Sequence, residues 1–183
     1  IHHYRNCVPF PLLYYPSISI YLQITGGIMD FTNIFENINK SKMGSDINNF
    51  GWHMIENTLD EELISRTKKD IDRLSNDKDV EVNHNGTEHR IWKSNLKSKN
   101  IESFFKFSNK VISEISKSNK IAYDILAIRN LKLKDFNDKK LTQGRWHLDS
   151  FNNQLKVFLF LSDVNEKSGP FEIIPNSHKK LFK

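Results

Sequence analysis

The sequence predicts a β-rich α+β fold, because helix-like and strand-like patterns occupy different parts of the chain. In the first half, apolar residues recur at helical spacing in two segments, 58–74 and 100–115. In the second half, the segments 141–149, 154–162 and 171–174 are short and rich in apolar, β-branched or aromatic residues, as strands are. Helices followed by a run of strands are typical of an α+β domain.

The composition is that of a folded protein. The chain has 183 residues, of which 38% are hydrophobic and 27% charged, so it is long enough for one domain and too apolar for global disorder. The net charge of +5 is a mild excess of lysine mixed with acidic residues, and we therefore expect no nucleic-acid partner. Cys7 is the single cysteine, which excludes an intramolecular disulfide and favours a reducing, cytoplasmic location.

Residues 1–28 differ in composition from the rest of the chain. Arg5 is the only charged residue before Met29, and three of the five prolines interrupt the apolar run Val8–Ile24. Proline breaks helices, so this run does not predict a stable membrane span. We interpret residues 1–28 as non-native upstream sequence or a targeting segment, with a structural arm as the remaining alternative, and set them aside from the fold.

Residues 29–50 are polar and rich in asparagine, and we expect a lead-in segment there. It contains one short predicted helix, broken at Gly44 and Ser45. The apolar face of that helix consists of Ile34, Phe35 and Ile38.

The predicted domain covers residues 51–183 and opens with a strand, Gly51–Asn57. Thr58 and Glu61 have the spacing of a capping box, which predicts a helix from Thr58 to about Leu74. The face of that helix that we expect to be buried consists of Leu63, Thr67, Ile71 and Leu74.

The composition of the next segment, 75–100, predicts a loop. The segment 121–134 is predicted to end in a strand. Two histidines of the loop, His84 and His89, lack a nearby third ligand, so we expect no zinc site there. We expect His53 near the surface of its strand, without a functional role.

His147-Leu148-Asp149 is the pattern with the clearest chemistry. Side chains at i and i+2 of a strand point to the same face, so the imidazole and the carboxylate can reach one divalent metal. Nitrogen and oxygen ligands suit iron(II), and a second histidine would complete a 2-His-1-carboxylate triad with open positions. Taken alone, His-x-Asp is also compatible with a surface ion pair.

The surrounding sequence resembles the phytanoyl-CoA dioxygenase family. The resemblance covers about 40 residues, 141–179, in which Trp-His-x-Asp is followed by LKVFLFLSDV, by Gly-Pro-Phe and by Ile-Pro-Asn-Ser-His-Lys. Members are iron(II)- and 2-oxoglutarate-dependent oxygenases. The resemblance implies a double-stranded β-helix, or cupin-like jelly-roll, core with N-terminal helices packed on it. It implies hydroxylation of a small organic substrate with O2, while 2-oxoglutarate is converted to succinate and CO2.

Site roles follow from the resemblance position by position. His147 and Asp149 match two iron ligands, and Lys156 matches a polar position that contacts 2-oxoglutarate. Gln143 shares the ligand face by alternation and is a second candidate for the cosubstrate, while Arg145 is a candidate for an anionic substrate. By the same resemblance, His178 belongs to a structural turn after Ile-Pro, where Asn176 replaces the usual small residue and tolerates a left-handed backbone.

The family's distal histidine and its 2-oxoglutarate-binding arginine would follow Lys183. We therefore expect a C-terminally incomplete jelly-roll, and an inactive fragment of a dioxygenase. The alternative is a non-catalytic metal-binding domain of the cupin type, and a His followed by an Arg on later strands would favour the enzyme.

Overall fold

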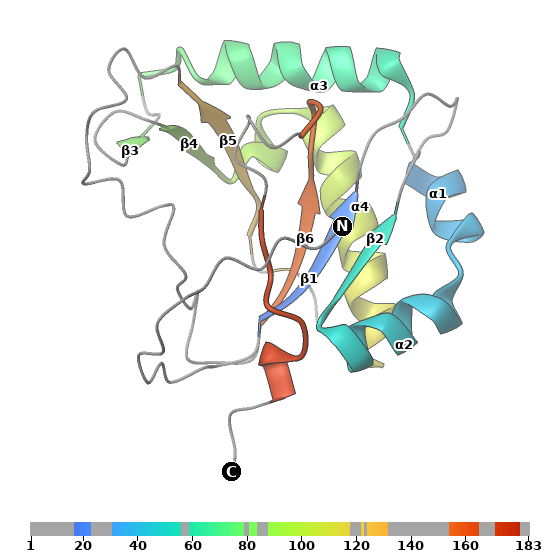
Figure 1. The fold of residues 1–183 in the computed structure, drawn as a ribbon. Helices are drawn as coiled ribbons and strands as arrows, with labels where there is room; N and C mark the ends of the chain where they lie inside the picture. Colours follow the sequence, from blue (N-terminus) through green and yellow to red (C-terminus); the bar gives the residue numbers. More distant parts are fainter. Residues whose placement is uncertain are drawn as a thin grey trace, which may run out of the picture.

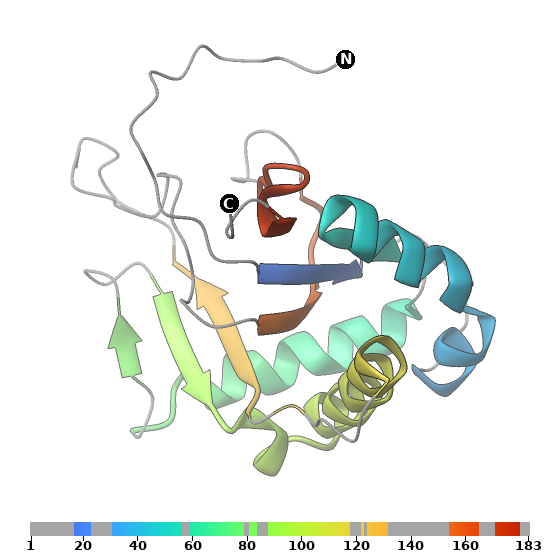
Figure 2. The same cartoon turned by 90° about the horizontal axis from the view of Figure 1, so that it is seen from below.

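The structure is a computed structural model that describes only part of the chain. Backbone and side chains are described for residues 31–55, 59–78, 88–117, 122, 124–131, 154–164 and 171–179, and the backbone alone for 17–22 and 81–83. In these ranges helices and strands alternate along the chain, and α3 and α4 lie on one side of the strands (Figures 1 and 2).

The described strands form two sheets of three. One sheet has the order β2-β1-β6 and all of its pairs are parallel; its strands are Trp52–Ile55, Ser17–Leu22 and Gln154–Leu159. The other has the order β3-β4-β5 and its pairs are antiparallel; its strands are Glu81–Asn83, Glu88–Trp92 and Leu126–Asn130. A jelly-roll is not seen among the described strands, so the predicted jelly-roll core stays a prediction.

The central strand of the parallel sheet, β1, lies within residues 1–28, which we set aside from the fold because of their composition. Its backbone pairs along its whole length with β6, and Ser19 has both Trp52 and Lys156 as register partners. Through β1, two strands from the beginning and the end of the predicted domain become part of one sheet.

Two helices form within the predicted lead-in, α1 (Phe31–Asn37) and α2 (Lys40–Phe50). The prediction of a helix broken at Gly44 and Ser45 is wrong, because α2 continues through both residues. Glycine in a helix interior costs about 0.5–1 kcal/mol, and burial of the flanking Met43 and Ile47 in the core offsets that cost.

Helix α3 (Glu61–Leu74) is confirmed with a different start. Its N-cap is Asp60, whose carboxylate accepts a hydrogen bond from the Glu62 amide, and not the predicted Thr58, which lies outside the described residues. The predicted buried face agrees at Thr67, Ile71 and Leu74, with Ile64 as a further buried position.

The second long helix, α4, covers Lys99–Ser116 and begins slightly before the predicted start. Its N-cap is Ser98, whose hydroxyl accepts a hydrogen bond from the Ile101 amide. A one-turn 3-10 helix, η1 (Ser94–Leu96), precedes it.

The core lies between the helices and the two sheets. A larger cluster joins α1, α2, α3 and α4, and β6 packs against it through Leu155, Val157 and Leu159. A smaller cluster joins α3, α4, β4 and β5, and Ile125 and Leu161 contact both clusters. Among the described helices, none combines the length and the apolar character needed to cross a membrane.

Two strand predictions differ from the structure. The predicted loop, 75–100, contains β3 and β4. Periodicity does not predict β4, because Ile91 is its single buried residue and no alternation results. The third predicted strand, Phe171–Ile174, has no strand pairing and leads into η4 (Ser177–Lys179). Strand β6 is confirmed, while the predicted strand 141–149 lies outside the described residues.

Candidate functional site

The candidate site lies on the face of the sheets that points away from α3 and α4. Strand β6 separates two surfaces, because its alternate residues point to opposite sides. The side with Val157 packs on the helical core. On the other side, the rings of Phe158 and Phe160 stack with centroids 6.5 Å apart, and Lys156 shares this face by alternation.

Strand β2 extends this face. Met54 shares a register position with Phe158 across β1, so both side chains lie on one side of the sheet. Trp52 and Lys156 share the next position on that side. Met54 is exposed, so a thioether and aromatic rings lie near Lys156 on the side of the sheet opposite α3 and α4.

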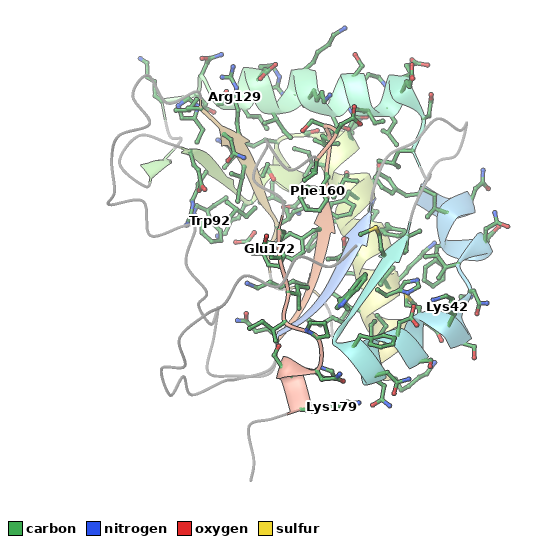
Figure 3. All side chains as sticks on the ribbon, viewed as in Figure 1. Lys42, Trp92, Arg129, Phe160, Glu172 and Lys179 are labelled. Carbon is green, nitrogen blue, oxygen red and sulfur yellow. The ribbon has the colours of Figure 1, made fainter. Side chains whose placement is uncertain are left out.

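The antiparallel sheet adds a second apolar surface on its helix-free side. Trp92 on β4 and Ile128 on β5 are 50% and 46% exposed, whereas their neighbours Ile91 and Ala127 are buried against the helices. In Figure 3 the side chains of Trp92, Phe160 and Glu172 project from the strands and from the segment beside them. Large exposed apolar groups that gather on one face are typical of binding surfaces.

Phe171 completes the aromatic group at β6. Its ring lies 5.4 Å from that of Phe158, although the two residues belong to different segments. The segment that carries Phe171 then ends in a turn in which the Asn176 amide donates to the Phe50 carbonyl at 3.1 Å. Asn176 has a φ of 63°, which confirms the predicted left-handed conformation.

His178 closes this turn against the end of α2. Its Nε2 atom lies 3.2 Å from the carbonyl oxygen of Asn48, and its ring contacts Gly51. With its ring held there, His178 joins the turn to the end of α2.

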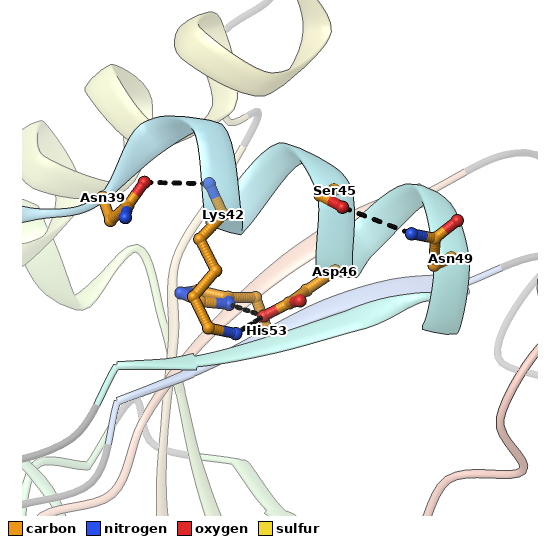
Figure 4. A network of polar contacts seen from close by, with 6 residues as sticks. All are labelled: Asn39, Lys42, Ser45, Asp46, Asn49 and His53. Atoms are coloured by element: carbon orange, nitrogen blue, oxygen red, sulfur yellow. Dashed lines mark hydrogen bonds and ion pairs between the residues drawn. The ribbon is translucent and has the colours of Figure 1, made fainter.

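His53 is the histidine that the structure places differently from the prediction. It is buried, with 8% of its surface exposed, and not near the surface of its strand. Its Nδ1 lies 2.7 Å from Oδ2 of Asp46, and Nζ of Lys42 lies 2.5 Å from the same oxygen (Figure 4). The hydrogen bonds from Lys42 and then His53 lower the pKa of Asp46, because both donors favour the charged carboxylate.

This network stabilises the α2–β2 pair and lies on the core side of the sheet. His53 shares a register position with Val157, which faces the helical core, so the imidazole is on the opposite face from Lys156. No sequence pattern predicts this pairing, because Asp46 precedes His53 by seven residues and lies on another element.

The structure describes one of the five predicted site residues. Lys156 lies on β6, half-buried beside the stacked phenylalanines. The other four, His147, Asp149, Gln143 and Arg145, lie outside the described residues, as does His84. Within the described ranges, no three His, Cys, Asp or Glu side chains gather as a possible metal site.

Sequence reasoning also missed part of the aromatic face. Phe158 and Phe160 follow from alternation within β6, but Met54, Trp92 and Phe171 come from three other segments. Phe171 belongs to the Gly-Pro-Phe motif quoted above, but only the packing of these segments brings its ring to Phe158.

Comparison of the chain with protein-family models, with curated proteins and with solved structures finds no match. The geometry of the helix-free face and the chemistry of the residues therefore carry the functional argument.

Proposed function

We propose that the chain belongs to an iron(II)- and 2-oxoglutarate-dependent oxygenase of the phytanoyl-CoA dioxygenase type. The observation that carries this proposal is the two-sided β6 strand. One side packs on the helices through Val157, and the other side places Lys156 beside Phe158 and Phe160. In the proposed enzyme the face with Lys156 would line the interior pocket, and the opposite face would pack on the helices.

The donor chemistry fits iron(II). His147 would supply an imidazole nitrogen and Asp149 a carboxylate oxygen, which are two of the three ligands of a facial triad. Two of the described histidines are used elsewhere, because His53 contacts Asp46 and His178 contacts Asn48. When bound, iron and 2-oxoglutarate would supply the oxidation of a C–H bond of a small substrate.

The residues of the chain have separate tasks in this proposal. The Lys156 ammonium pairs with a carboxylate of 2-oxoglutarate, and the neighbouring phenyl rings exclude water and strengthen that pairing. Gln143 donates a hydrogen bond to the cosubstrate, and Arg145 holds an anionic part of the substrate. The apolar rings of Phe158, Phe160 and Phe171 form a wall for the carbon skeleton of the substrate.

Anaerobic titration of the full chain with iron(II) and then 2-oxoglutarate tests this function. We expect iron(II) binding that is lost in both His147→Ala and Asp149→Ala. We expect a 2-oxoglutarate-dependent absorption band whose half-saturation rises about tenfold or more in Lys156→Ala, since a charge-assisted pair contributes about 1.5–3 kcal/mol.

Lys179→Ala is the matched control, because Lys179 is an exposed lysine of η4 away from the aromatic face. Its titration should equal that of the wild type. The proposal is overturned if the wild-type chain binds no iron(II), or if the ligand variants bind it as tightly as the wild type does.

A further inference from the structure

A second concave surface lies between α1 and the C-terminal half of α4. It is shallow and open to solvent, with a volume of about 460 Å³. The residues that line it are Phe35, Asn109, Lys110, Ser113, Glu114 and Lys117. None of them belongs to the aromatic face of β6, so this surface is independent of the proposed oxygenase site.

The wall of this cavity is a fixed aromatic ring. Phe35 packs edge-to-face on Phe107, with centroids 6.5 Å apart and an interplanar angle of 86°. Phe107 is 1% exposed and contacts Phe31 and Phe104 as well, so the ring that supports Phe35 is held by the core. The cavity wall therefore has a defined position.

Two lysines are gathered on this ring. The ammonium of Lys40 lies 4.7 Å and that of Lys110 5.7 Å from the centroid of Phe35. Cations are attracted to the face of an aromatic ring, so the Phe35 ring holds both ammonium groups beside this surface. Within the described part of the chain, neither ammonium forms an ion pair with a carboxylate.

Two neighbouring lysines, Lys106 on α4 and Lys117 at its C-cap, differ in this respect. Lys117 pairs with Glu114 at 2.5 Å, and Lys106 pairs with Glu102 at 2.6 Å. The hydrogen bond from Lys117, and to a smaller extent the charge of Lys40, lower the pKa of Glu114, so this carboxylate is held in its charged form. Lys40 and Lys110 leave an excess of two positive charges beside the cavity.

Asn109 adds a neutral donor. Its side-chain oxygen accepts a hydrogen bond from the Ala122 amide at 2.5 Å, which fixes the orientation of the side chain. The NH₂ group at the other end of the amide can only donate. The cavity therefore combines two ammonium groups, an amide donor and an apolar wall.

We propose that this cavity binds a phosphate monoester dianion between Lys40 and Lys110. A phosphate monoester carries about −1.5 to −2 charges at pH 7, which matches the excess positive charge, and lysine is a common partner of phosphate. Its oxygens accept from both ammonium groups and from Asn109, while the carbon attached to the ester lies on Phe35. A free metabolite and a lipid headgroup present this same chemistry.

Calorimetric titration of the full chain tests the site with two probes. Glycerol 1-phosphate represents a free metabolite, and phosphatidylcholine vesicles containing phosphatidic acid represent a headgroup. We expect saturable binding of at least one probe, weakened about tenfold or more in Lys40→Gln and in Lys110→Gln. Binding should also weaken from pH 7.5 to pH 5, because the dianion gains a proton near pH 6.

Lys106→Gln is the matched control, since it removes an exposed lysine of α4 that is not one of the two lysines over the Phe35 ring. It should bind like the wild type. Circular dichroism of the three variants establishes that each keeps its helices. The proposal is overturned if neither probe binds saturably, or if Lys106→Gln weakens binding as much as Lys40→Gln and Lys110→Gln do.

Discussion

The imidazole of His178 occupies the place into which a side chain on Gly51 would project. A Cβ atom on Gly51 would lie 2.5 Å from Nδ1 of His178, and the Nε2 atom of the same ring lies 3.2 Å from the Asn48 carbonyl oxygen. Gly51 also ends α2 in the left-handed conformation, with a φ of 89°. One glycine thus ends a helix and admits a ring from a distant segment.

Gly51→Ala should therefore destabilise the protein for two reasons. The left-handed backbone costs an L-residue about 1–2 kcal/mol, and displacement of the His178 ring adds to that cost. Urea denaturation should show a lower free energy of unfolding with an unchanged slope. In a His178→Ala background the penalty should shrink, because only the backbone term is left.

Gly44→Ala is the matched control for this prediction. Gly44 lies inside α2, and no atom is within 4 Å of the place a Cβ would take. Alanine there should raise the free energy of unfolding by about 0.5–1 kcal/mol, since it limits the unfolded backbone. Equal effects of the two substitutions would contradict the close contact at Gly51.

The Asp46 network predicts a loss of stability in acid. Lys42 and His53 lower the pKa of Asp46 in the folded protein below 3.8, so the folded state favours the ionised carboxylate. The resulting stabilisation is fully present above pH 3.8 and is lost as the pH falls through the lowered pKa.

This prediction is checked by urea denaturation of the wild type and Asp46→Asn between pH 7 and pH 3. The wild type should be the more stable protein at pH 7, and the difference should decline toward pH 3. Glu36→Gln, at an exposed carboxylate of α1, serves as the control. A difference that stays constant over this range would disprove the charge-dependent part of the network.

Asp70 joins α3 to the beginning of α4. Its Oδ2 accepts hydrogen bonds from the Ser98 hydroxyl at 2.6 Å and from the Asn100 amide at 2.9 Å. Burial raises the pKa of Asp70, but these hydrogen bonds and Arg73 outweigh it, so that the pKa is lowered overall. The carboxylate therefore supports the N-cap of α4 in its charged form.

Asp70→Ala should lower the free energy of unfolding by about 1–3 kcal/mol, because two donors lose their acceptor. Thermal denaturation followed by circular dichroism measures the effect. Glu62→Ala removes an exposed carboxylate of the same helix, paired with Arg66 at 3.5 Å, and should change stability by less than about 1 kcal/mol. Similar losses in both variants would show that Asp70 acts only as a surface charge.

Local periodicity was sufficient to predict the buried face of elements with a strongly amphipathic pattern. The apolar face of α3 was predicted through Thr67, Ile71 and Leu74, and these residues are buried. Alternation within a strand likewise accounts for Phe158 and Phe160 lying on one face of β6. In both cases the information lies within a few consecutive residues, where backbone geometry alone decides which side chains share a face.

Other features depended on contacts that no local pattern contains. The sequence argued for a break at Gly44, but α2 passes through it because Met43 and Ile47 pack into the core. The partner of His53 could not be predicted, because Asp46 reaches His53 only when α2 packs against β2. Packing energy from such contacts exceeds a helix propensity cost of about 1 kcal/mol.

The sequence by itself determined the two long helices, the two-sided strand β6 and the residue chemistry from which an iron site is proposed at His147 and Asp149. The tertiary structure alone decided that β1 lies between β2 and β6, that Phe171 meets Phe158, and that His178 rests on Gly51. The physical reason is distance along the chain. Periodicity records which side of an element is apolar, whereas the choice of partner depends on the packing of all elements together.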